Sequence, residues 1–565
     1  MVNVKNLFGM AVMATALVGC SSNDNLAPDG KDNVGKTGEA YASFKINLPT
    51  TNGTRAVDSE TGTEFDGGTA AEYEVKNGTI LIFDNSGKFV ESAELGTMNP
   101  WTKDTDDNGV TTAAAVTVQL HNVKVGTSYK ALVLLNNNSE TTPKVTLPTT
   151  ADTYTSWSKD ADKANADRYV STDGIFMANA PKYEATKDPT TLVDLNSVYA
   201  SREQAQANPA TVVYVERGLA KVTMDDFASN YPINAGTYKG DNVKIVNWQL
   251  DVTNKYTFPI HQADLKSEWS AVWSEPRFYD NTSSAFKRVY WGTDPNYSGT
   301  DNLTLTNCKK AFNMIGNGDV KGLPGTPQYC LENTFDLDNM KQGQTTRVVF
   351  KAVYTPKTFT TGETFYKVAN NTAIWKEAAL KQQILTLAIN AMKITDPDEQ
   401  SMYSVDLTKG SNISGKAGQH FVAAENIKFD PGESAKTSKV DDGVINEINE
   451  KLGLSEEDPT THKEKVGIST YLNGEAYYIA RIKHFNELTP WNPGEAYGSK
   501  NKEYLGRYGV LRNNWYSLSV HSISNLGYPE VPTVKPNLPD DENDQYINVE
   551  VKILDWAKRS QRIDL

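Results

Sequence analysis

The sequence offers one stretch that could bind a hard metal ion. Residues Asp104 to Gly109, which read DTDDNG, look like the start of a calcium-binding loop. The twelfth position counted from Asp104 is Ala115, whereas an EF-hand needs a bidentate glutamate there. This departure favours a polar hairpin tip over a calcium site.

The histidines and clustered acids lack a catalytic arrangement as well. His462, His484 and His521 lie toward the C-terminal end, but not at metal-ligand spacing, and we expect them to face solvent or to be hydrogen-bonded within strands. Residues 456–458 (EED) are adjacent in a polar segment, which favours a solvated surface over the separated carboxylates of a glycosidase. The sequence has no G-x-S-x-G, Walker or G-x-G-x-x-G motif. We therefore predict no enzyme, no metal and no cofactor.

Three tryptophans could form a platform that stacks on sugars. These are Trp248, Trp291 and Trp375. Packing in a hydrophobic core is the default for such side chains, so it is the favoured interpretation. A secreted glycan-active enzyme is disfavoured because the sequence lacks the rest of a catalytic site.

Charge and length limit the kinds of partner and the architecture. The chain has 565 residues, which at about 150 residues per domain predicts two to four domains. With 56 Lys and Arg against 70 Asp and Glu, the net charge is −14. Binding to nucleic acid needs clustered positive charge, so we expect no nucleic-acid partner.

The N-terminus predicts export and attachment of a lipid. Lys5 precedes a short apolar run from Leu7 to Val18, which is typical of a secretory signal and too short for a membrane span. Residues 17–20 (LVGC) resemble a bacterial lipobox, which implies cleavage before Cys20 and a lipid on its thiol. An ordinary signal peptide with a chance cysteine is the alternative. The polar run that follows predicts a flexible tether.

The rest of the chain is predicted to be mostly β. Short runs rich in Val, Ile, Thr and Tyr alternate with turn residues, which favours antiparallel sandwiches. Residues 84–87 (DNSG) predict a hairpin in which Gly87 takes a positive φ. One helix is predicted over Ile374–Met392. The predicted strands include residues 79–84, 115–120, 129–135, 212–215, 243–252, 346–354, 477–482 and 515–523.

Near the start of the chain lies a strand with strict period two. Ala42, Phe44, Ile46 and Leu48 alternate with polar residues over 40–48, which indicates a half-buried strand. A polar, glycine-containing loop follows it. This loop contains one arginine, Arg55, and exposed loops of this kind are where proteases cut.

A second such strand ends the chain. Ile547, Val549, Val551 and Ile553 alternate with polar residues, after a Pro-rich and acidic segment at residues 528–544. We expect that segment to be an extended, solvated connector. The strand either folds back and pairs within its own chain or offers its edge to another molecule.

Besides the lipobox, several stretches share one family likeness. They are residues 53–56 (GTRA), 126–137 (GTSYKALVLLNN), 213–224 (VYVERGLAKVTM), 345–357 (TTRVVFKAVYTPK), 510–529 (VLRNNWYSLSVHSISNLGYP) and the ending NVEVKILDW…IDL. Together they resemble the fimbrillins of the Bacteroidetes, most closely the major stalk subunit of Mfa-type fimbriae. Longer spacers around residues 258–329 and 395–465 depart from the family's pattern.

The resemblance implies a pilus subunit that crosses the periplasm as an outer-membrane lipoprotein and ends in a cell-surface fimbria. An Arg-specific protease would cut between Arg55 and Ala56, removing the strand that holds Ala42, Phe44, Ile46 and Leu48. The groove left behind would accept the C-terminal strand of the next subunit.

The implied fold is two transthyretin-like antiparallel β-sandwich domains with a few helices and an extended C-terminal strand. The expected divisions are a signal peptide (1–19), a propeptide with tether and removable strand (20–55), an N-terminal domain (56–228), a C-terminal domain (229–530), and a connector with donor strand (531–565).

The implied partners are identical subunits joined head to tail, the protease, and accessory tip and anchor subunits. The host or bacterial ligand of the filament is not indicated. The alternative function is a lipid-anchored adhesin or fimbrial tip subunit that binds glycan or protein; a terminal subunit would need no donor strand. Cys308 and Cys330 could form a disulfide or be two buried thiols.

Overall fold

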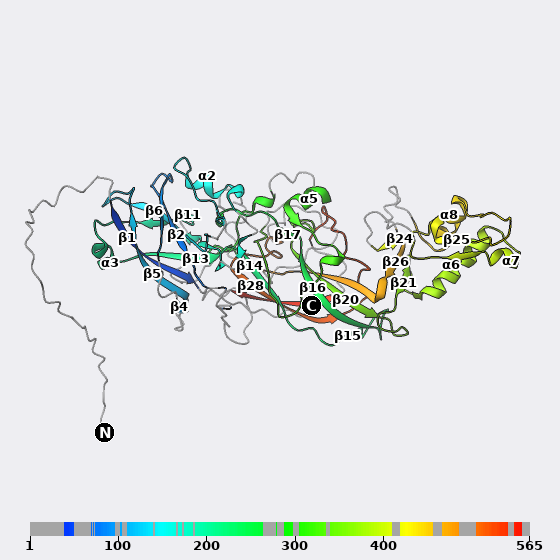
Figure 1. The fold of residues 1–565 in the computed structure, drawn as a ribbon. Helices are drawn as coiled ribbons and strands as arrows, with labels where there is room; N and C mark the ends of the chain where they lie inside the picture. The colour runs from blue at the N-terminus through cyan, green and yellow to red at the C-terminus, as the bar shows by residue number, and fades with distance from the viewer. Residues whose placement is uncertain are drawn as a thin grey trace, which may run out of the picture.

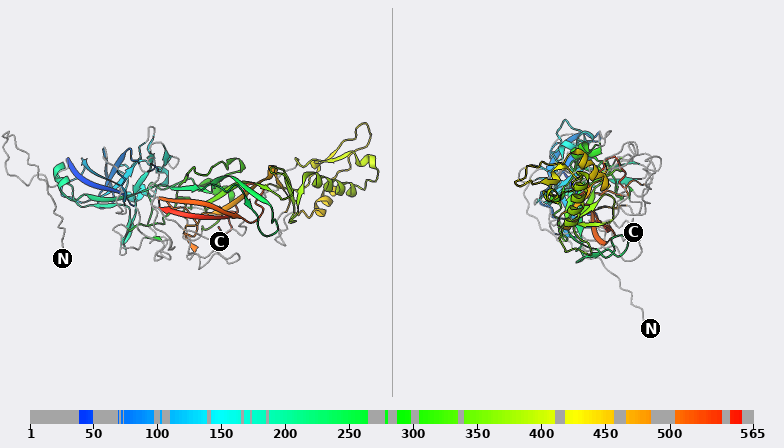
Figure 2. Two further views of the ribbon diagram at one scale, coloured as in Figure 1. Left: turned by 90° about the horizontal axis from the view of Figure 1, so that it is seen from below. Right: turned by 90° about the vertical axis from the view of Figure 1, so that its right-hand side faces the viewer.

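The computed structural model describes two β-rich bodies and an α/β insertion arranged in an elongated molecule (Figures 1 and 2). Its mostly β composition, with few helices, confirms the predicted fold class. Over the described part of the chain, no helix has the length and apolar character needed to cross a membrane. The described residues are 39–49, 69, 72, 74–96, 102–103, 110–138, 142–164, 168–171, 174–184, 187–263, 278–279, 287–297, 304–334, 339–409, 418–455, 466–484, 504–540 and 547–555.

The first body is built on a large curved sheet. Apolar side chains of its strands pack into two cores. Phe44, Ile82 and Val133 belong to one of them, and Leu81 and Leu132, on the opposite face of β2 and β6, belong to the other. Two short helices, α2 (Tyr154–Ser158) and α3 (Arg202–Ala207), flank the sheet. In spatial order the strands are β3 (Phe89–Glu94), β2 (Gly78–Phe83), β6 (Tyr129–Leu135), β9 (Met177–Asn179), β13 (Thr211–Arg217), β1 (Ala40–Pro49), β5 (Val110–Leu120) and β4 (Thr102–Lys103), with β12 (Val193–Leu195) paired to β6.

The hairpin between β2 and β3 forms as predicted. Gly87 has φ +84°, a conformation that a glycine adopts without strain. The carboxylate of Asp84 accepts hydrogen bonds from the backbone N–H groups of Ser86 and Lys88, at 2.8 and 3.0 Å. The turn is therefore fixed by its own side chain.

The second body is a sandwich of two four-stranded sheets. Val222, Tyr516 and Leu518 from one sheet share a core with Trp248 and Phe350 from the other. One sheet has the order β19 (Gln328–Cys330), β14 (Ala220–Met224), β28 (Asn514–Ile523), β29 (Ile547–Asp555); the other has β15 (Tyr231–Pro232), β16 (Asn242–Asp251), β20 (Arg347–Thr355), β27 (Glu475–Arg481).

An insertion between β20 and β27 lies at the end of the molecule farthest from β1 (Figure 1). The predicted helix starts later than expected, because Ile374–Lys376 is a strand that pairs with β21. The insertion contains the sheet β22 (Ile374–Lys376), β21 (Phe365–Val368), β26 (Ile468–Tyr471), β24 (Gln419–His420), the pair β23 (Tyr403–Val405) and β25 (Ile427–Phe429), and helices α6 (Glu377–Ala391), α7 (Pro397–Gln400) and α8 (Asp442–Lys451).

Shorter elements complete the described fold. Cys308 and Phe312 from these elements belong to a further core cluster, which also includes Trp291 and Tyr297. Cys308 and Cys330 are both buried free thiols, so the disulfide alternative does not hold in this structure. The elements are α5 (Leu305–Ala311), the pair β17 (Thr253–Asn254) and β18 (Phe312–Asn313), the pair β7 (Val170–Ser171) and β8 (Gly174–Ile175), and the pair β10 (Lys182–Glu184) and β11 (Lys187–Thr190).

Among the described strands, pairing is antiparallel except at two places that the sequence did not indicate. β1 runs parallel to β13, and β14 runs parallel to β28. Along the chain, the last strand of the first sheet ends at Arg217, and the next strand, β14, belongs to the second body. The domain boundaries given above, including 228/229, remain a prediction.

Candidate assembly site: the first and last strands

β1 is an interior strand with a neighbour on each side. It pairs antiparallel with β5 along its whole length, and in parallel with β13 from Phe44 to Asn47. The side chains of Ala42, Phe44 and Ile46 are fully buried in the core of the first body. The predicted half-buried strand is therefore present. Leu48 lies within β1, but its side chain is outside the described residues.

Polar contacts fix the start of β1. Tyr41 and Tyr199 exchange two backbone hydrogen bonds, of 2.8 and 2.9 Å. The Arg202 guanidinium lies 5.6 Å from the centre of the Tyr41 ring, a distance at which cation–π attraction acts. On the same face, the hydroxyls of Ser43 and Thr117 are 2.9 Å apart. The Ser43–Thr117 contact joins β1 to β5, and the Tyr41 contacts join it to the segment that holds Tyr199 and Arg202.

One residue of β1 fits its surroundings poorly. Asn47 is only 3% exposed, and its side-chain oxygen has no hydrogen-bond partner. A buried acceptor without a partner costs about 1–3 kcal/mol. This side chain lies on the opposite face of the strand from Ile46.

β29 folds back onto its own chain, at the edge of a sheet. It pairs antiparallel with β28, from Ile547 opposite Ile523 to Asp555 opposite Asn514. Among the described strands, β28 is its only ladder partner. The backbones of all four predicted donor residues, Ile547, Val549, Val551 and Ile553, take part in this strand.

The side chain of Val549 shows which way the alternating set faces. It is 8% exposed and belongs to the core of the sandwich. The side chains of Ile547, Val551 and Ile553 lie outside the described residues. The apolar face of the last strand is thus used within its own chain at Val549.

The predicted solvated connector is instead docked on the second body, and the prediction was wrong for residues 528–540. Tyr528 exchanges two backbone hydrogen bonds with Tyr477, both of 2.8 Å. Asp540 is 1% exposed, and its carboxylate accepts a hydrogen bond of 2.8 Å from the Arg507 guanidinium. Composition indicated a polar segment, but these partners lie far away in the sequence.

A buried polar network joins β13, the parallel neighbour of β1, to the second body. Glu216 in β13 contacts Nδ1 of His261 at 2.7 Å and Nε of Arg288 at 3.1 Å. Burial raises the pKa of this carboxyl, but the nearby His261 and Arg288 outweigh it and hold the pKa below its usual range. Arg288 also donates to the backbone oxygen of Arg512 at 2.8 Å.

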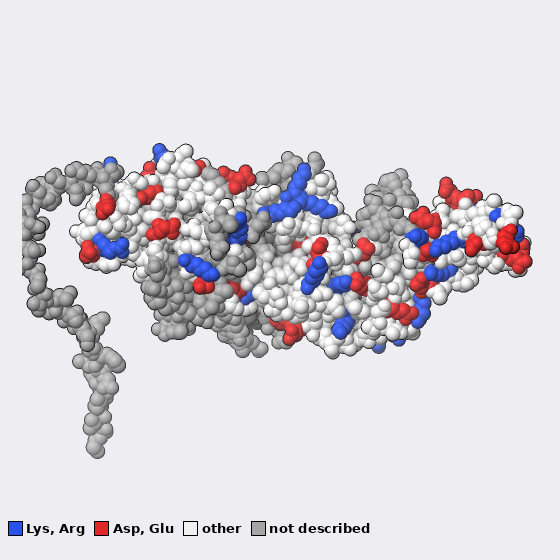
Figure 3. All heavy atoms as spheres, viewed as in Figure 1, with Lys and Arg blue, Asp and Glu red and all other residues white. Residues whose placement is uncertain are grey.

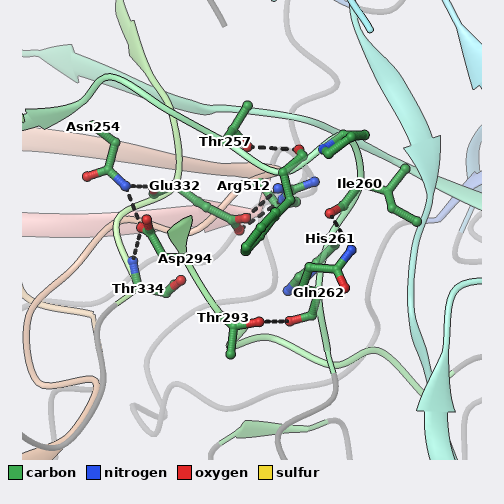
Figure 4. A network of polar contacts seen from close by, with 12 residues as sticks. Asn254, Thr257, Ile260, His261, Gln262, Thr293, Asp294, Glu332, Thr334 and Arg512 are labelled. Carbon is green, nitrogen blue, oxygen red and sulfur yellow. Dashed lines mark hydrogen bonds and ion pairs between the residues drawn. The ribbon is translucent and has the colours of Figure 1, made fainter. Parts of the chain in front are cut away.

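The network continues deeper into the second body. Figure 4 shows Arg512 against Glu332, where Nε lies 2.9 Å from Oε2, and Asp294 close to Asn254 and Thr334. Burial raises the pKa of Asp294 to about 7. We did not predict this network, because its members are separated by long stretches of sequence. It holds β13 in place, and so supports one wall of the position that β1 occupies.

Tryptophans and histidines that could have formed a sugar platform or a metal site lie elsewhere in the fold. Trp248 and Trp291 are fully buried, which contradicts an exposed sugar platform at these two positions. His484 is buried with Nδ1 2.8 Å from the Tyr516 hydroxyl, and His521 is exposed. Within the described residues, no group of three or more His, Cys, Asp and Glu side chains could hold a metal ion.

The predicted processing sites and several other candidates lie outside the described residues. These are Cys20, Arg55 and Ala56, the acidic stretches at residues 104–109 and 456–458, and His462. They remain predictions from the sequence.

One known family matches the end of the chain. Residues 469–562 match the family described as major fimbrial subunit protein type IV, fimbrillin, C-terminal. The match includes β27, β28 and β29. No curated protein matches the chain.

Three solved structures show distant similarity. A Parabacteroides distasonis protein assigned to cell adhesion is 9% identical, with a TM-score of 0.38 over 93% of this chain and 99% of that one. A fimbrial assembly protein of the same species is 12% identical, with a TM-score of 0.26 over 57% and 88%. The C-terminally truncated tip fimbrial protein Mfa3 of Porphyromonas gingivalis is 11% identical, with a TM-score of 0.22 over 91% and 100%.

Proposed function

We propose that this chain, whose residues 469–562 match the C-terminal fimbrillin family, is a fimbrial subunit that polymerises by donor-strand exchange. Cleavage between Arg55 and Ala56 would separate β1 from the rest of the chain. The terminal strand of another copy would then take the place of β1. The observation that carries this proposal is the interior position of β1, paired on both sides, in contrast to the edge position of β29.

Loss of β1 would leave a groove that favours the binding of another strand. The backbone groups of β5 and β13 that face β1 would lose their partners, and the core would open where Phe44 and Ile46 now lie. Unpaired strand edges beside an apolar groove favour the addition of an extended segment. A one-residue slip of that segment would turn its apolar side chains outward, so the register would be strongly specified.

The terminal strand has the pattern that such a groove accepts. Ile547, Val549, Val551 and Ile553 alternate with polar residues, as the buried residues of β1 do. Burying four such side chains contributes on the order of 6–12 kcal/mol. Association costs roughly 4–15 kcal/mol, which offsets much of this gain. Among the described strands β29 has one ladder partner, and a second ladder of hydrogen bonds in the groove would favour exchange.

Because donor strand and groove lie on different bodies of the subunit, the contact is head-to-tail. Heterologous contacts that do not close into a ring generate open filaments. The precursor would reach the outer membrane as a lipoprotein anchored through Cys20, and an Arg-specific protease would release it. The filament would support adhesion, with accessory tip and anchor subunits at its ends. A tip subunit or anchored adhesin stays the alternative function.

Trypsin treatment of the purified precursor tests the proposal. Cleavage after Arg55 should produce a ladder of SDS-resistant oligomers, whereas the Arg55→Ala variant, exposed to the same protease, should stay monomeric. A variant that lacks residues 546–565 should be cleaved but form no ladder. Complete cleavage of the wild-type chain without any oligomer would refute strand exchange and favour the tip or adhesin alternative.

A further inference from the structure

The insertion in the second body leaves and re-enters the sandwich at neighbouring points. β20 and β27 are adjacent antiparallel strands, with Val353 opposite Glu475. Residues 356–474 connect them, and the sheet would stay paired with a much shorter connection. Such a connection is the usual structural setting of an inserted domain.

The insertion has a hydrophobic core of its own. All buried members of this core lie between Tyr366 and Ile468. Leu380, Ile384 and Ala388 form the buried face of α6, and Ile448 of α8 packs in the same cluster. A separate contiguous core is what distinguishes a domain from a long loop.

Two short strands mark the border between this core and that of the sandwich. In β21 and β26, Val368 lies opposite Ile468, and both pack in the core of the insertion. Three residues along these strands, nearer the sandwich, the rings of Phe365 and Tyr471 stack with centroids 4.6 Å apart and belong to the sandwich core. The hydroxyl of Tyr471 also donates to the backbone oxygen of Gly527 at 2.8 Å.

Ion pairs within the insertion join elements that are distant in sequence. Lys436 lies 2.7 Å from Asp396 and 3.0 Å from Glu399, and Lys439 lies 2.7 Å from Glu399. Figure 3 shows acidic side chains interspersed with basic ones at this end of the molecule. Exposed pairs contribute little individually, but here they connect the start of α7 to the segment before α8.

We infer that the insertion between Tyr366 and Ile468, the bounds of its own core, forms a separately folding module that the fimbrial subunit carries but does not use in assembly. This second part rests on the proposed function. β1 lies in the first body, and β29 pairs within a sheet that contains no strand of the module. Removal of β1 and withdrawal of β29 would therefore break no strand pairing of the module, whose Gly418 packs against Pro529 in the segment before β29.

Hydrogen exchange in the full chain tests whether the module folds separately. Ile384→Ala in the module and Ile482→Ala in the sandwich are matched, because both isoleucines are fully buried. Ile384→Ala should speed amide exchange within residues 369–467 by about tenfold or more, and leave β16 and β20 unchanged. Equal acceleration in β16 and β20 would overturn the inference. Ile482→Ala serves as the control that those strands can report a loss of stability.

A deletion tests whether assembly needs the module. Residues 369–467 are replaced by Asn-Gly, a two-residue turn that suits the directly opposed Val368 and Ile468. Tyr366, Val368 and Ile468 are changed to threonine, since the module would no longer cover them. After trypsin this variant should form the same ladder as the full chain, shifted by its mass.

The two proposals fail in distinguishable ways. A folded, cleaved deletion variant that forms no ladder, while the full chain does, would show that assembly uses the module. Absence of a ladder from the full chain would refute strand exchange instead, and the hydrogen-exchange result would still decide whether the module folds separately. If the deletion variant does not fold while the exchange is localised as expected, the module is separate but stabilises the sandwich, which contradicts a merely carried module.

Discussion

The first strands of the two bodies have the same topology and different anchoring. β1 in the first body lies between an antiparallel neighbour, β5, and a parallel one, β13. β14 in the second body lies between an antiparallel neighbour, β19, and a parallel one, β28. Each is thus an interior strand that its own sheet cannot lose without leaving a gap.

Their side chains differ in kind. β14 carries Lys221, whose ammonium lies 2.7 Å from the buried carboxylate of Glu72 and 3.6 Å from the centre of the Trp515 ring. β1 carries apolar side chains in its core and the unpaired oxygen of Asn47. Under the proposed function, β1 is removed and β14 stays. A strand that must leave is better attached by apolar packing, which another apolar strand can replace, than by buried charges that need a specific partner.

Truncating one buried side chain in each strand should give the largest difference between β1 and β14. Phe44→Ala in β1 should lower the free energy of unfolding of the precursor by about 3–5 kcal/mol, and Val222→Ala in β14 should also lower it. After cleavage and exchange, only Val222→Ala should still weaken the polymer, because Phe44 is no longer in it. Denaturant melts of precursor and ladder measure both. A polymer weakened by Phe44→Ala would mean that β1 stays in place.

Removing a charged side chain should change stability by different amounts in the two strands. Lys221→Met leaves the buried Glu72 carboxylate without its cation, and we expect a loss of about 3 kcal/mol of stability. Lys45→Met in β1 removes an exposed charge and should change stability by less than about 0.5 kcal/mol. Urea melts of both precursors give the two values. Similar losses of stability from the two variants would contradict the idea that a buried charge holds β14 and apolar packing holds β1.

The same ion pair predicts a pH dependence. Burial raises the pKa of Glu72, but Lys221, the Thr69 N–H and the Tyr329 hydroxyl outweigh it and hold the pKa below the usual 4.5. Between these values the unfolded chain binds more protons, so the contribution of Glu72 is present above about pH 4.5 and is lost as pH falls through its lowered pKa. Glu72→Gln should therefore flatten the acid side of the stability curve, measured by urea melts between about pH 3 and pH 6. An unchanged slope would contradict this role.

Local pattern was enough to predict the strands, and it could not predict their partners. Alternation and β-branched residues located β1, β6 and β28 closely. The same alternation in β29 suits self-pairing and exchange equally, so the sequence left both open. The contact of Lys221 with Glu72 joins residues that are far apart along the chain, and no local signal indicates it.

In the insertion, local sequence signals could predict the helices but not their packing into a separate core. α6 begins at Glu377 rather than Ile374, because Ile374 and Trp375 pair with β21 in a strand. Asp396, followed by Pro397, and Asp441 cap α7 and α8, and these cap signals could have located both helices. That the helices share a core apart from the sandwich depends on the tertiary fold.

The smallest expected effect comes from replacing Asn47, the residue of β1 with a buried and unpaired side-chain oxygen. Asn47→Leu replaces a buried, unpaired acceptor by an apolar group of similar size, and should stabilise the precursor by about 1 kcal/mol. If β1 must leave before exchange, this gain slows ladder formation after cleavage by about fivefold. Ser43→Val is the control on the same face: it breaks the contact with Thr117 and should destabilise the precursor. Faster assembly by Asn47→Leu would show that the departure of β1 does not limit the rate, and that Asn47 is not what makes this strand easier to remove than β14.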